Sequence, residues 1–249
     1  MRYFIQFSYF GGAYHGWQNQ PNATTVQELL EAAMTKLLNA PISLMGAGRT
    51  DTGVHAKEMY AHFEVDTFKS IPKFIFRLNS FLPDDIAVQR IFEVADEAHA
   101  RFDAVERTYT YVIMTTKDPF LMNSAYFVKK KLDIDQMNKA ATMLLGKKDF
   151  ECFSKTKTDV YTHICDLKTA RWTQEKDFLV FTITADRFLR NMVRAIVGTL
   201  LNVGTGKYSA DYVNTILKSR DRSKAGTSVP AKGLYLTSIT YPNTILKNG

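Results

Sequence analysis

One carboxylate, that of Asp51, lies in the segment 48–56 (GRTDTGVHA) between an arginine two residues before it and a histidine four residues after it. Gly48 and Gly53 bracket this carboxylate, and glycine lets a backbone turn tightly and approach a ligand closely. An aspartate in such a loop is more often structural, in an Asx turn or at a helix N-cap. The spacing alone therefore leaves a catalytic and a structural role for Asp51 open.

A phosphate-binding P-loop is excluded by two positions. Residues 204–207 (GTGK) look like its end, but Leu201 stands where the loop needs glycine and Tyr208 where it needs serine or threonine. No Gly-x-Gly-x-x-Gly follows a predicted strand either. An enzyme of nucleotide metabolism would need such a loop or a metal site, so this class is disfavoured.

A metal centre is not expected. His62 and Glu64 form the His-x-Glu of zinc deaminases, but neither Cys152 nor Cys165 lies in the Pro-Cys-x-x-Cys that those enzymes also need. The five histidines show no ligand spacing for any metal. We interpret His62 as a strand residue.

The composition bounds the class of protein. Of 249 residues, 45% are hydrophobic and 23% charged, as in a soluble globular protein with one large or two ordinary domains. No apolar run approaches the ~20 residues of a membrane helix, and the alternating N-terminus is not that of a secretory signal. Only two cysteines are present, which favours a reducing cytoplasm. A formal charge of +7 and a pI of about 9.2 favour a polyanionic partner.

The first half of the chain begins with a strand at 2–9, followed by a loop rich in glycine and aromatic residues. Thr24 or Thr25 caps a helix that carries Glu28 in the position of a capping box. Further elements of this half are expected as strands at 42–45, 59–65 and 86–94 and a helix at 71–82.

The second half, which begins near residue 99, repeats the order of elements. We expect its helices to be capped by Asp133, with Gly146 as the stop, and by Ser209. The expected elements are strands at 107–115, 164–172, 178–185 and 233–241 and helices at 133–145, 189–203 and 209–218.

Each half thus runs roughly strand, helix, strand, strand, helix, strand. This order predicts an α+β fold, with two ferredoxin- or RRM-like sheet-and-helix halves around a mainly antiparallel sheet and a cleft between them. We place an N-terminal domain at residues 1–100, which carries the Asp51 loop, and a C-terminal domain at residues 101–249.

The segment around Asp51 resembles the catalytic signature of the TruA-type tRNA pseudouridine synthases. The resemblance continues in the family's order over nearly the whole chain, in segments 9–18 (YFGGAYHGWQ), 25–27 (TVQ), 79–88 (NSFLPDDIAV), 99–102 (HARF), 107–111 (RTYTY), 188–198 (FLRNMVRAIVG) and 232–236 (KGLYL). Thr52 departs from the family, which more often has alanine there. Residues 156–165 follow the pattern poorly, so no site residue is taken from them.

The resemblance implies an isomerase that converts uridine to pseudouridine at positions 38 to 40 of the tRNA anticodon stem-loop. Members of the family need no metal or organic cofactor, and they act as homodimers with one tRNA bound across both subunits. We therefore expect tRNA and a second copy of the chain as partners, no membrane association and a cytoplasmic location. Which of the three uridines is modified does not follow from the sequence.

The same resemblance assigns roles to three residues. Asp51 is the essential carboxylate, which could attack the sugar, attack the base or remove a sugar proton. Arg194 pairs with it, because a nearby guanidinium lowers the pKa of a carboxyl group and fixes its orientation. Tyr109 matches the family's active-site tyrosine, whose ring stacks on a uracil flipped out of the stem. Tyr111 lies on the same strand face, so the sequence alone does not choose between the two tyrosines.

Further residues are candidates for substrate contacts. We expect Arg49 to contact the RNA backbone, and His55 and Leu234 to contribute to substrate binding. Lysine runs are more often simply solvated, so those of this chain are weaker candidates for phosphate contacts. The candidate RNA contacts are Tyr14, Trp17, Gln18, Lys129 and Lys130, with His15 of the same loop and Lys131, Lys147 and Lys148 as further candidates.

The alternative class is an RNA-binding protein that uses the same scaffold without catalysis. The discriminating feature is Asp51, because a passive binder has no reason to place a carboxylate in a cationic groove, where it repels phosphate.

Overall fold

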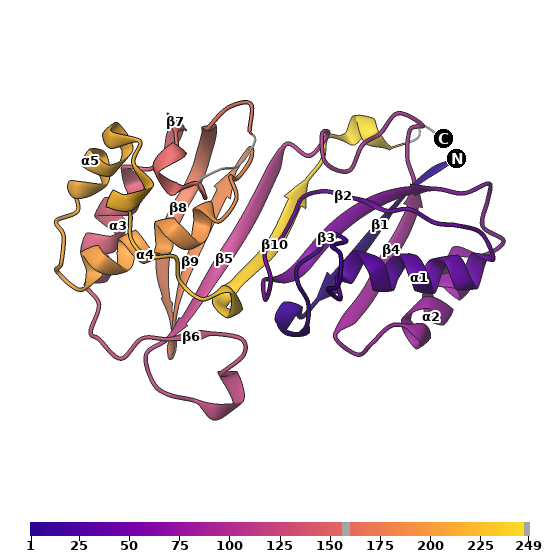
Figure 1. The fold of residues 1–249 in the computed structure, drawn as a ribbon, viewed down its shortest axis with the longest axis horizontal. Coiled ribbons are helices and arrows are strands. Elements are labelled where there is room, and N and C mark those ends of the chain that lie inside the picture. Colours follow the sequence, from indigo (N-terminus) through magenta and orange to yellow (C-terminus); the bar gives the residue numbers. More distant parts are fainter. Residues whose placement is uncertain (156–159, 247–249) are drawn as a thin grey trace. The chain divides into compact units, whose positions relative to one another are not determined.

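The chain divides into two units in the computed structural model, which describes residues 1–155 and 160–246 (Figure 1). Unit 1 comprises Met1–Val105 and Leu236–Gly249, and unit 2 comprises Glu106–Tyr235. The chain therefore enters unit 2 once and returns to unit 1 within its last strand. Residues 156–159, where the family resemblance is poor, lie outside the described residues.

The sheet of unit 1 has the strand order β4-β1-β3-β10, and β2 pairs with β3. β1 pairs antiparallel with both neighbours, so Ile5 lies opposite Ala61 on one side and Ile91 on the other. The side chain of Glu58 on β3 accepts a hydrogen bond from the backbone N–H of Ile239 on β10, at 2.9 Å. The strands are β1 (Arg2–Tyr9), β2 (Met45–Gly46), β3 (His55–Glu64), β4 (Ile86–Glu93) and β10 (Leu234–Thr240).

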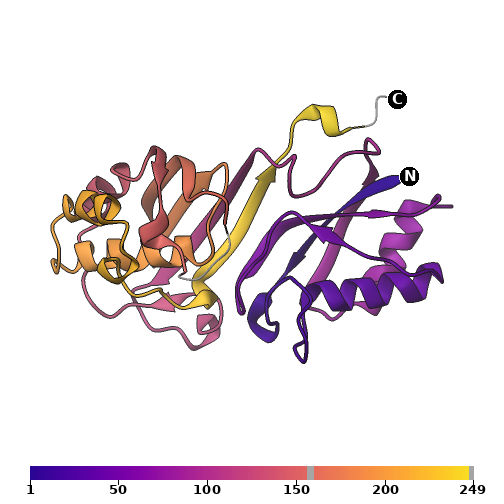
Figure 2. The ribbon, with the colours of Figure 1, turned by 45° about the horizontal axis from the view of Figure 1, so that its top comes forward.

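Two helices complete unit 1, α1 (Val26–Leu38) and α2 (Ile71–Phe81). Figure 2 shows α1 running alongside the strands of this unit, and α2 packs on α1 and on β4. The Thr25 side chain accepts a hydrogen bond from the Glu28 N–H at 3.3 Å, which satisfies one of the donors left open at a helix start.

The sheet of unit 2 has the strand order β5-β9-β8-β7, and these neighbours pair antiparallel. β6 is added to β5 in parallel. The core contains the fully buried Trp172, whose ring lies 4.8 Å from that of Phe181. The strands are β5 (Glu106–Met114), β6 (Tyr126–Phe127), β7 (Gly146–Asp149), β8 (Ile164–Glu175) and β9 (Phe178–Ala185).

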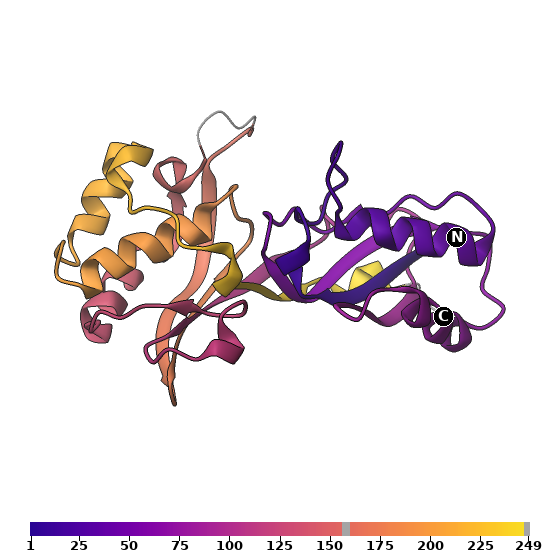
Figure 3. The ribbon, with the colours of Figure 1, turned by 60° about the horizontal axis from the view of Figure 1, so that its bottom comes forward.

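Three helices, α3 (Ile134–Thr142), α4 (Met192–Gly204) and α5 (Tyr212–Ser219), lie on one side of the strands of unit 2 (Figure 3). Asp133 caps α3 by accepting the Gln136 N–H at 3.0 Å. α4 is buried along most of its length and packs on α3. No helix of residues 1–155 and 160–246 is long and apolar enough to cross a bilayer.

The predicted α+β class and mainly antiparallel pairing are confirmed. The caps at Thr25 and Asp133 are confirmed as well, and His62 is a strand residue. The placement of functional domains at residues 1–100 and 101–249 stays a prediction.

Several predicted boundaries were wrong. The strand expected at 59–65 begins at His55, and its start was not predicted because its first four residues do not alternate between buried and outward side chains and include the polar Lys57 and Glu58. The strand expected at 42–45 is only Met45–Gly46, since the Leu44 N–H is taken by the Glu31 carboxylate at 2.7 Å. β7, at Gly146–Asp149, was not predicted. Gly146, with φ +87°, was interpreted only as the stop of the preceding helix, but it is also the first residue of this strand. The last helix begins at Tyr212, after a turn that contains Ser209.

Candidate active site

Asp51 lies on the loop between β2 and β3, which belongs to unit 1. Its side chain is half-buried, and its backbone carbonyl accepts the Val54 N–H at 3.1 Å, closing a tight turn with Gly53 at φ +78°. The hydroxyl of Thr50 forms a hydrogen bond of 2.9 Å with that of Tyr9, at the end of β1. The loop is thus tied to the sheet beside the carboxylate, while the neighbouring Arg49 is exposed.

A second loop, residues 10–17, holds the Asp51 loop through backbone groups. The Gly11 N–H donates to Nδ1 of His55 at 2.9 Å, and the Gly53 N–H donates to the Tyr14 carbonyl at 3.2 Å. Because Nδ1 accepts a hydrogen bond, it carries no proton in this arrangement. These bonds fix the two loops against one another at both ends of the turn.

The contact between the two loops is so close that it requires glycine. A Cβ on Gly11 would clash with the carbonyl of Val54, and a Cβ on Gly16 would clash with that of Thr50. Gly16 also has φ +88°, a conformation that side chains disfavour. The two glycines of the sequence YxGxxYxGWQ are therefore explained by the close approach of the backbone that carries Asp51.

Three predicted substrate or RNA contacts are buried in this arrangement. The side chain of His55 is 1% exposed and stacks on Phe10 with ring centroids 4.1 Å apart. Tyr14 is 4% exposed and donates its hydroxyl proton to Asp85, and burial raises the pKa of this tyrosine. Trp17 is 3% exposed and packs on Phe7.

Their burial favours a role in holding the loops over a direct contact. Gln18, in the same loop, is exposed. The direct contacts of His55, Tyr14, Trp17 and Gln18 with a substrate stay predictions.

The two tyrosines that the sequence could not separate differ in unit 2. Tyr111 is fully buried, and its hydroxyl donates to the Pro230 carbonyl at 2.8 Å. Burial raises the pKa of this phenol. Tyr109 is only half-buried, and its ring meets that of Phe188 edge-on, with centroids 5.2 Å apart. Tyr111 is therefore a core residue, and Tyr109 is the better candidate for a substrate contact.

Arg194 lies in the first turn of α4 and is held by the segment that follows α5. Its Nε donates to the Val229 carbonyl at 2.7 Å, and the Val229 N–H donates to the Arg194 carbonyl at 3.2 Å. The same segment approaches α4 so closely that a Cβ on Gly198 would clash with the Thr227 carbonyl. The backbone bond holds Val229 beside α4, and the bond from Nε to the Val229 carbonyl restrains the guanidinium group.

The remaining candidates are distributed over unit 2. Leu234, at the start of β10, is 6% exposed. Lys129 and Lys130 are exposed. Lys148 instead donates to the carbonyls of Met143 and Leu145, both at 2.6 Å. Its ammonium group therefore satisfies two backbone carbonyls just after the end of α3.

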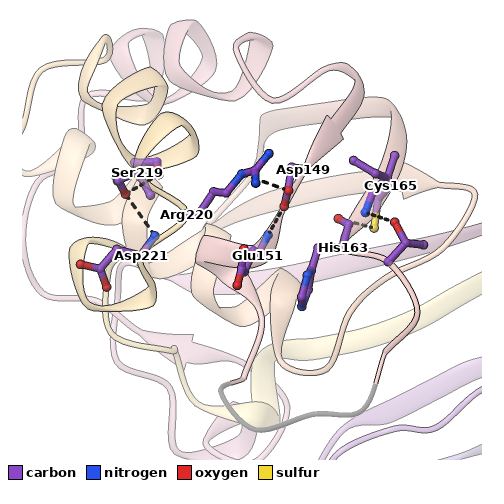
Figure 4. A network of polar contacts seen from close by, with 10 residues as sticks. Asp149, Glu151, His163, Cys165, Ser219, Arg220 and Asp221 are labelled. Carbon is purple, nitrogen blue, oxygen red and sulfur yellow. Dashed lines mark hydrogen bonds and ion pairs between the residues drawn. The ribbon is translucent and has the colours of Figure 1, made fainter.

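One group of possible metal ligands occurs among the described residues, formed by Asp149, Glu151 and His163 (Figure 4). Their ligand atoms lie within 4.8 Å of one another. Asp149 is already compensated, however, since Nε of Arg220 lies 3.2 Å from its carboxylate and the Glu151 N–H donates to it at 2.9 Å. We assign no metal to this group.

Comparison with known proteins bears on both units. The sequence profile of a family described as tRNA pseudouridine synthase matches residues 5–103 and 140–242. The chain belongs to this family. The pseudouridine synthases are isomerases, so the chain is a member of an enzyme family, and the match includes the Asp51 loop and α4.

Relatives of the chain are similar over almost their whole length. A tRNA pseudouridine synthase A of Parabacteroides distasonis is 50% identical over 247 residues, which cover 98% of this chain and 97% of that protein. One of Porphyromonas gingivalis is 48% identical over 248 residues, covering 98% of each chain. One of a Thermoanaerobacter species is 44% identical over 242 residues, covering 95% of this chain and 98% of that protein. Both units of the chain thus have counterparts in these pseudouridine synthases.

Two residues that hold candidate site residues were not predicted from the sequence. Tyr9 holds Thr50, and Val229 holds Arg194. Tyr9 lies within a motif that resembles the family, and its role could have been predicted, because a tyrosine hydroxyl at a strand end usually forms a hydrogen bond. Val229 acts through its backbone, which no side-chain pattern can indicate.

Proposed function

We propose that this chain isomerises uridine to pseudouridine in tRNA, at positions 38 to 40 of the anticodon stem-loop. One observation carries the proposal: Asp51, in the family signature, is a half-buried carboxylate on a loop that a second loop fixes by backbone hydrogen bonds. A structural aspartate at a turn or cap would not require glycines at Gly11 and Gly16 to bring another loop against it. The proposal is further supported by membership of the tRNA pseudouridine synthase family.

The reaction breaks the N1–C1′ bond of uridine, turns the base and joins C5 to C1′. A proton leaves C5 and N1 ends protonated, so the product is an isomer and no co-reactant is consumed. The Asp51 carboxylate serves this exchange as a nucleophile at the sugar, a nucleophile at the base or a base toward a sugar proton. Each of these roles requires the ionised carboxylate in a fixed orientation.

Arg194 and Tyr109 are proposed to act in the same reaction. The guanidinium of Arg194, held by Val229, pairs with the Asp51 carboxylate and orients it. The half-buried ring of Tyr109 stacks on the uracil once it is flipped out of the stem. Arg49 contacts the backbone beside the flipped nucleotide, and Leu234 contributes to the uracil pocket.

The working form is proposed to be a homodimer in the cytoplasm that binds one tRNA across both subunits. The formal charge of +7 supports a polyanionic substrate. Lys129 and Lys130, both exposed, are candidates for phosphate contacts.

The proposal is tested by tritium release from tRNA labelled at C5 of uridine, with the enzyme alone and with sequencing of pseudouridine positions. Asp51→Asn should reduce release by at least about 10³-fold, while tRNA affinity changes only a few-fold, because the amide keeps the shape and loses the charge. Asp66→Asn, an exposed carboxylate of the same unit, is the matched control and should keep full activity. Full turnover by Asp51→Asn, or product outside positions 38 to 40, would contradict the proposal.

A further inference from the structure

The outer side of α2 presents an aromatic residue where an amphipathic helix ordinarily has polar ones. Phe74 and Leu78 face the interior, and Phe76, midway between them along the chain, lies on the opposite side of the helix. Phe76 is 75% exposed. Phe81, at the end of the helix, is 50% exposed. Single exposed apolar residues are common, so their surroundings decide what this face can bind.

The charged side chains that α2 itself carries are all positive. Lys73 precedes Phe76 and Arg77 follows it, and α2 contains no carboxylate. Lys36 of α1 extends over the Phe81 ring, with Nζ 5.2 Å from the ring centroid. Pro72 joins Lys73, Phe76 and Arg77 around a shallow, open hollow.

We define the α2 face as Lys73, Phe76, Arg77 and Phe81 together with Lys36. We propose that the α2 face is an RNA-binding surface, on which Lys73 and Arg77 contact phosphates and Phe76 stacks on an unpaired base. An aromatic side chain flanked by cations is the combination that binds single-stranded nucleic acid. The inference rests on the proposed function only for the identity of the RNA, which is then the tRNA substrate.

A second copy of the chain fits this face less well. In a symmetric dimer the same patch meets itself, so the cations of one copy would face those of the other. Like charges brought together in this way disfavour association. A polyanion instead neutralises every cation of the face.

The test uses the full-length protein and a full-length unmodified tRNA transcript. The variant Lys73→Gln/Phe76→Ser/Arg77→Gln should bind tRNA at least about tenfold more weakly, since stacking on one base and two phosphate contacts are removed. The slope of log affinity against log salt should fall in magnitude by about 1.8 if both phosphates belong to a duplex, at ~0.9 for each. At saturating tRNA, kcat should be unchanged and KM raised. The matched control is Lys176→Gln/Phe120→Ser/Lys218→Gln, which removes two exposed lysines and a phenylalanine of 95% exposure in unit 2.

The single variants Phe76→Trp and Phe76→Ser separate stacking from a merely structural role. Phe76→Trp should keep the wild-type affinity for tRNA, whereas Phe76→Ser should lose part of it. Unchanged affinity and salt slope in the triple variant, with a wild type that makes pseudouridine in tRNA, would overturn the inference and leave the proposed function intact. A wild type that binds tRNA through this face but makes no pseudouridine would support the inference and contradict the proposed function. Two other results would also overturn it: loss only of binding to vesicles containing anionic phospholipid, or loss only of the dimer in light scattering.

Discussion

The two units hold their candidate functional groups by different means. In unit 1, Asp51 lies on a loop, and its position depends on a second loop whose backbone donates to His55 and accepts from Gly53. In unit 2, Tyr109 lies on β5 and Arg194 on α4, so regular elements supply the position and one backbone carbonyl fixes the guanidinium. A loop held by backbone contacts tolerates little change in its partner, whereas a strand or helix is supported by many neighbours.

This comparison predicts that function in unit 1 is sensitive to single atoms on residues that never touch the substrate. A shift of about 1 Å in a reacting group can cost roughly 10²-fold in rate. In unit 2, substitutions of supporting residues should reduce the free energy of unfolding. Activity should fall only where the substituted side chain itself acts on the substrate.

Among the variants that compare the two units, the largest effect is expected from Gly16→Ala. The new methyl group would meet the backbone of Thr50 and Asp51, and alanine at φ +88° adds about 1–2 kcal/mol of strain. We expect a loss of at least about 10²-fold in tritium release and of at least about 2 kcal/mol in the free energy of unfolding by urea.

Gly146→Ala is the matched control in unit 2. Gly146 has φ +87°, but no atom lies within 4 Å of a Cβ built there. This variant should show the strain alone, about 1–2 kcal/mol, with kcat unchanged. Equal losses of activity in the two variants would mean that backbone strain, and not contact with the Asp51 loop, decides the effect.

The same contrast shows how far the sequence leads. Periodicity and caps indicated the helices and most strands, because burial and helix ends leave a mark on side-chain types: Thr25 with Glu28, and Asp133, are examples. The Asp51 loop could be singled out only by its resemblance to a family. Its chemistry depends on which backbone carbonyl lies beside Gly16, and a local pattern does not contain such a contact.

Unit 2 gives a second example in Tyr109 and Tyr111. Both point to one strand face, and only the structure shows that the hydroxyl of Tyr111 is bound to the Pro230 carbonyl. The choice between them depends on a residue more than a hundred positions away, which no local sequence pattern records.

These two tyrosines should separate activity from stability. Tyr109→Ala removes the proposed stacking ring from a half-buried position, so kcat for tRNA should fall by about tenfold or more. Tyr111→Phe removes the hydrogen bond from the buried Tyr111 side chain to the Pro230 carbonyl and should reduce the free energy of unfolding by about 0.5–1.5 kcal/mol with kcat nearly unchanged. Single-turnover rates and urea unfolding of both variants measure the split. A larger loss of kcat in Tyr111→Phe than in Tyr109→Ala would reverse the assignment.

The smallest effect concerns pH and again distinguishes unit 1. Nδ1 of His62 accepts the Ala100 N–H at 3.1 Å, and burial, followed by the neighbouring charges of His99 and Arg2, lowers the pKa of His62 to about 4; Glu64 and Asp103 oppose this shift. The unfolded chain therefore binds the proton first as the pH falls. The stability that neutral His62 contributes is fully present above its ordinary pKa of 6.5 and is lost as the pH falls toward 4.

His62→Gln keeps an acceptor in the side chain and removes the titration. Since His62 is only partly buried and solvent screens its charge, the wild type should lose about 1–2 kcal/mol more unfolding free energy than the variant between these pH values. Urea unfolding at a series of pH values measures this difference. The contributions of the carboxylates cancel in it, because both proteins contain the same carboxylates. Parallel curves for the two proteins would mean that the Ala100 contact survives protonation. A steeper wild-type curve would show that a neutral histidine holds the turn at residues 99–103 of unit 1.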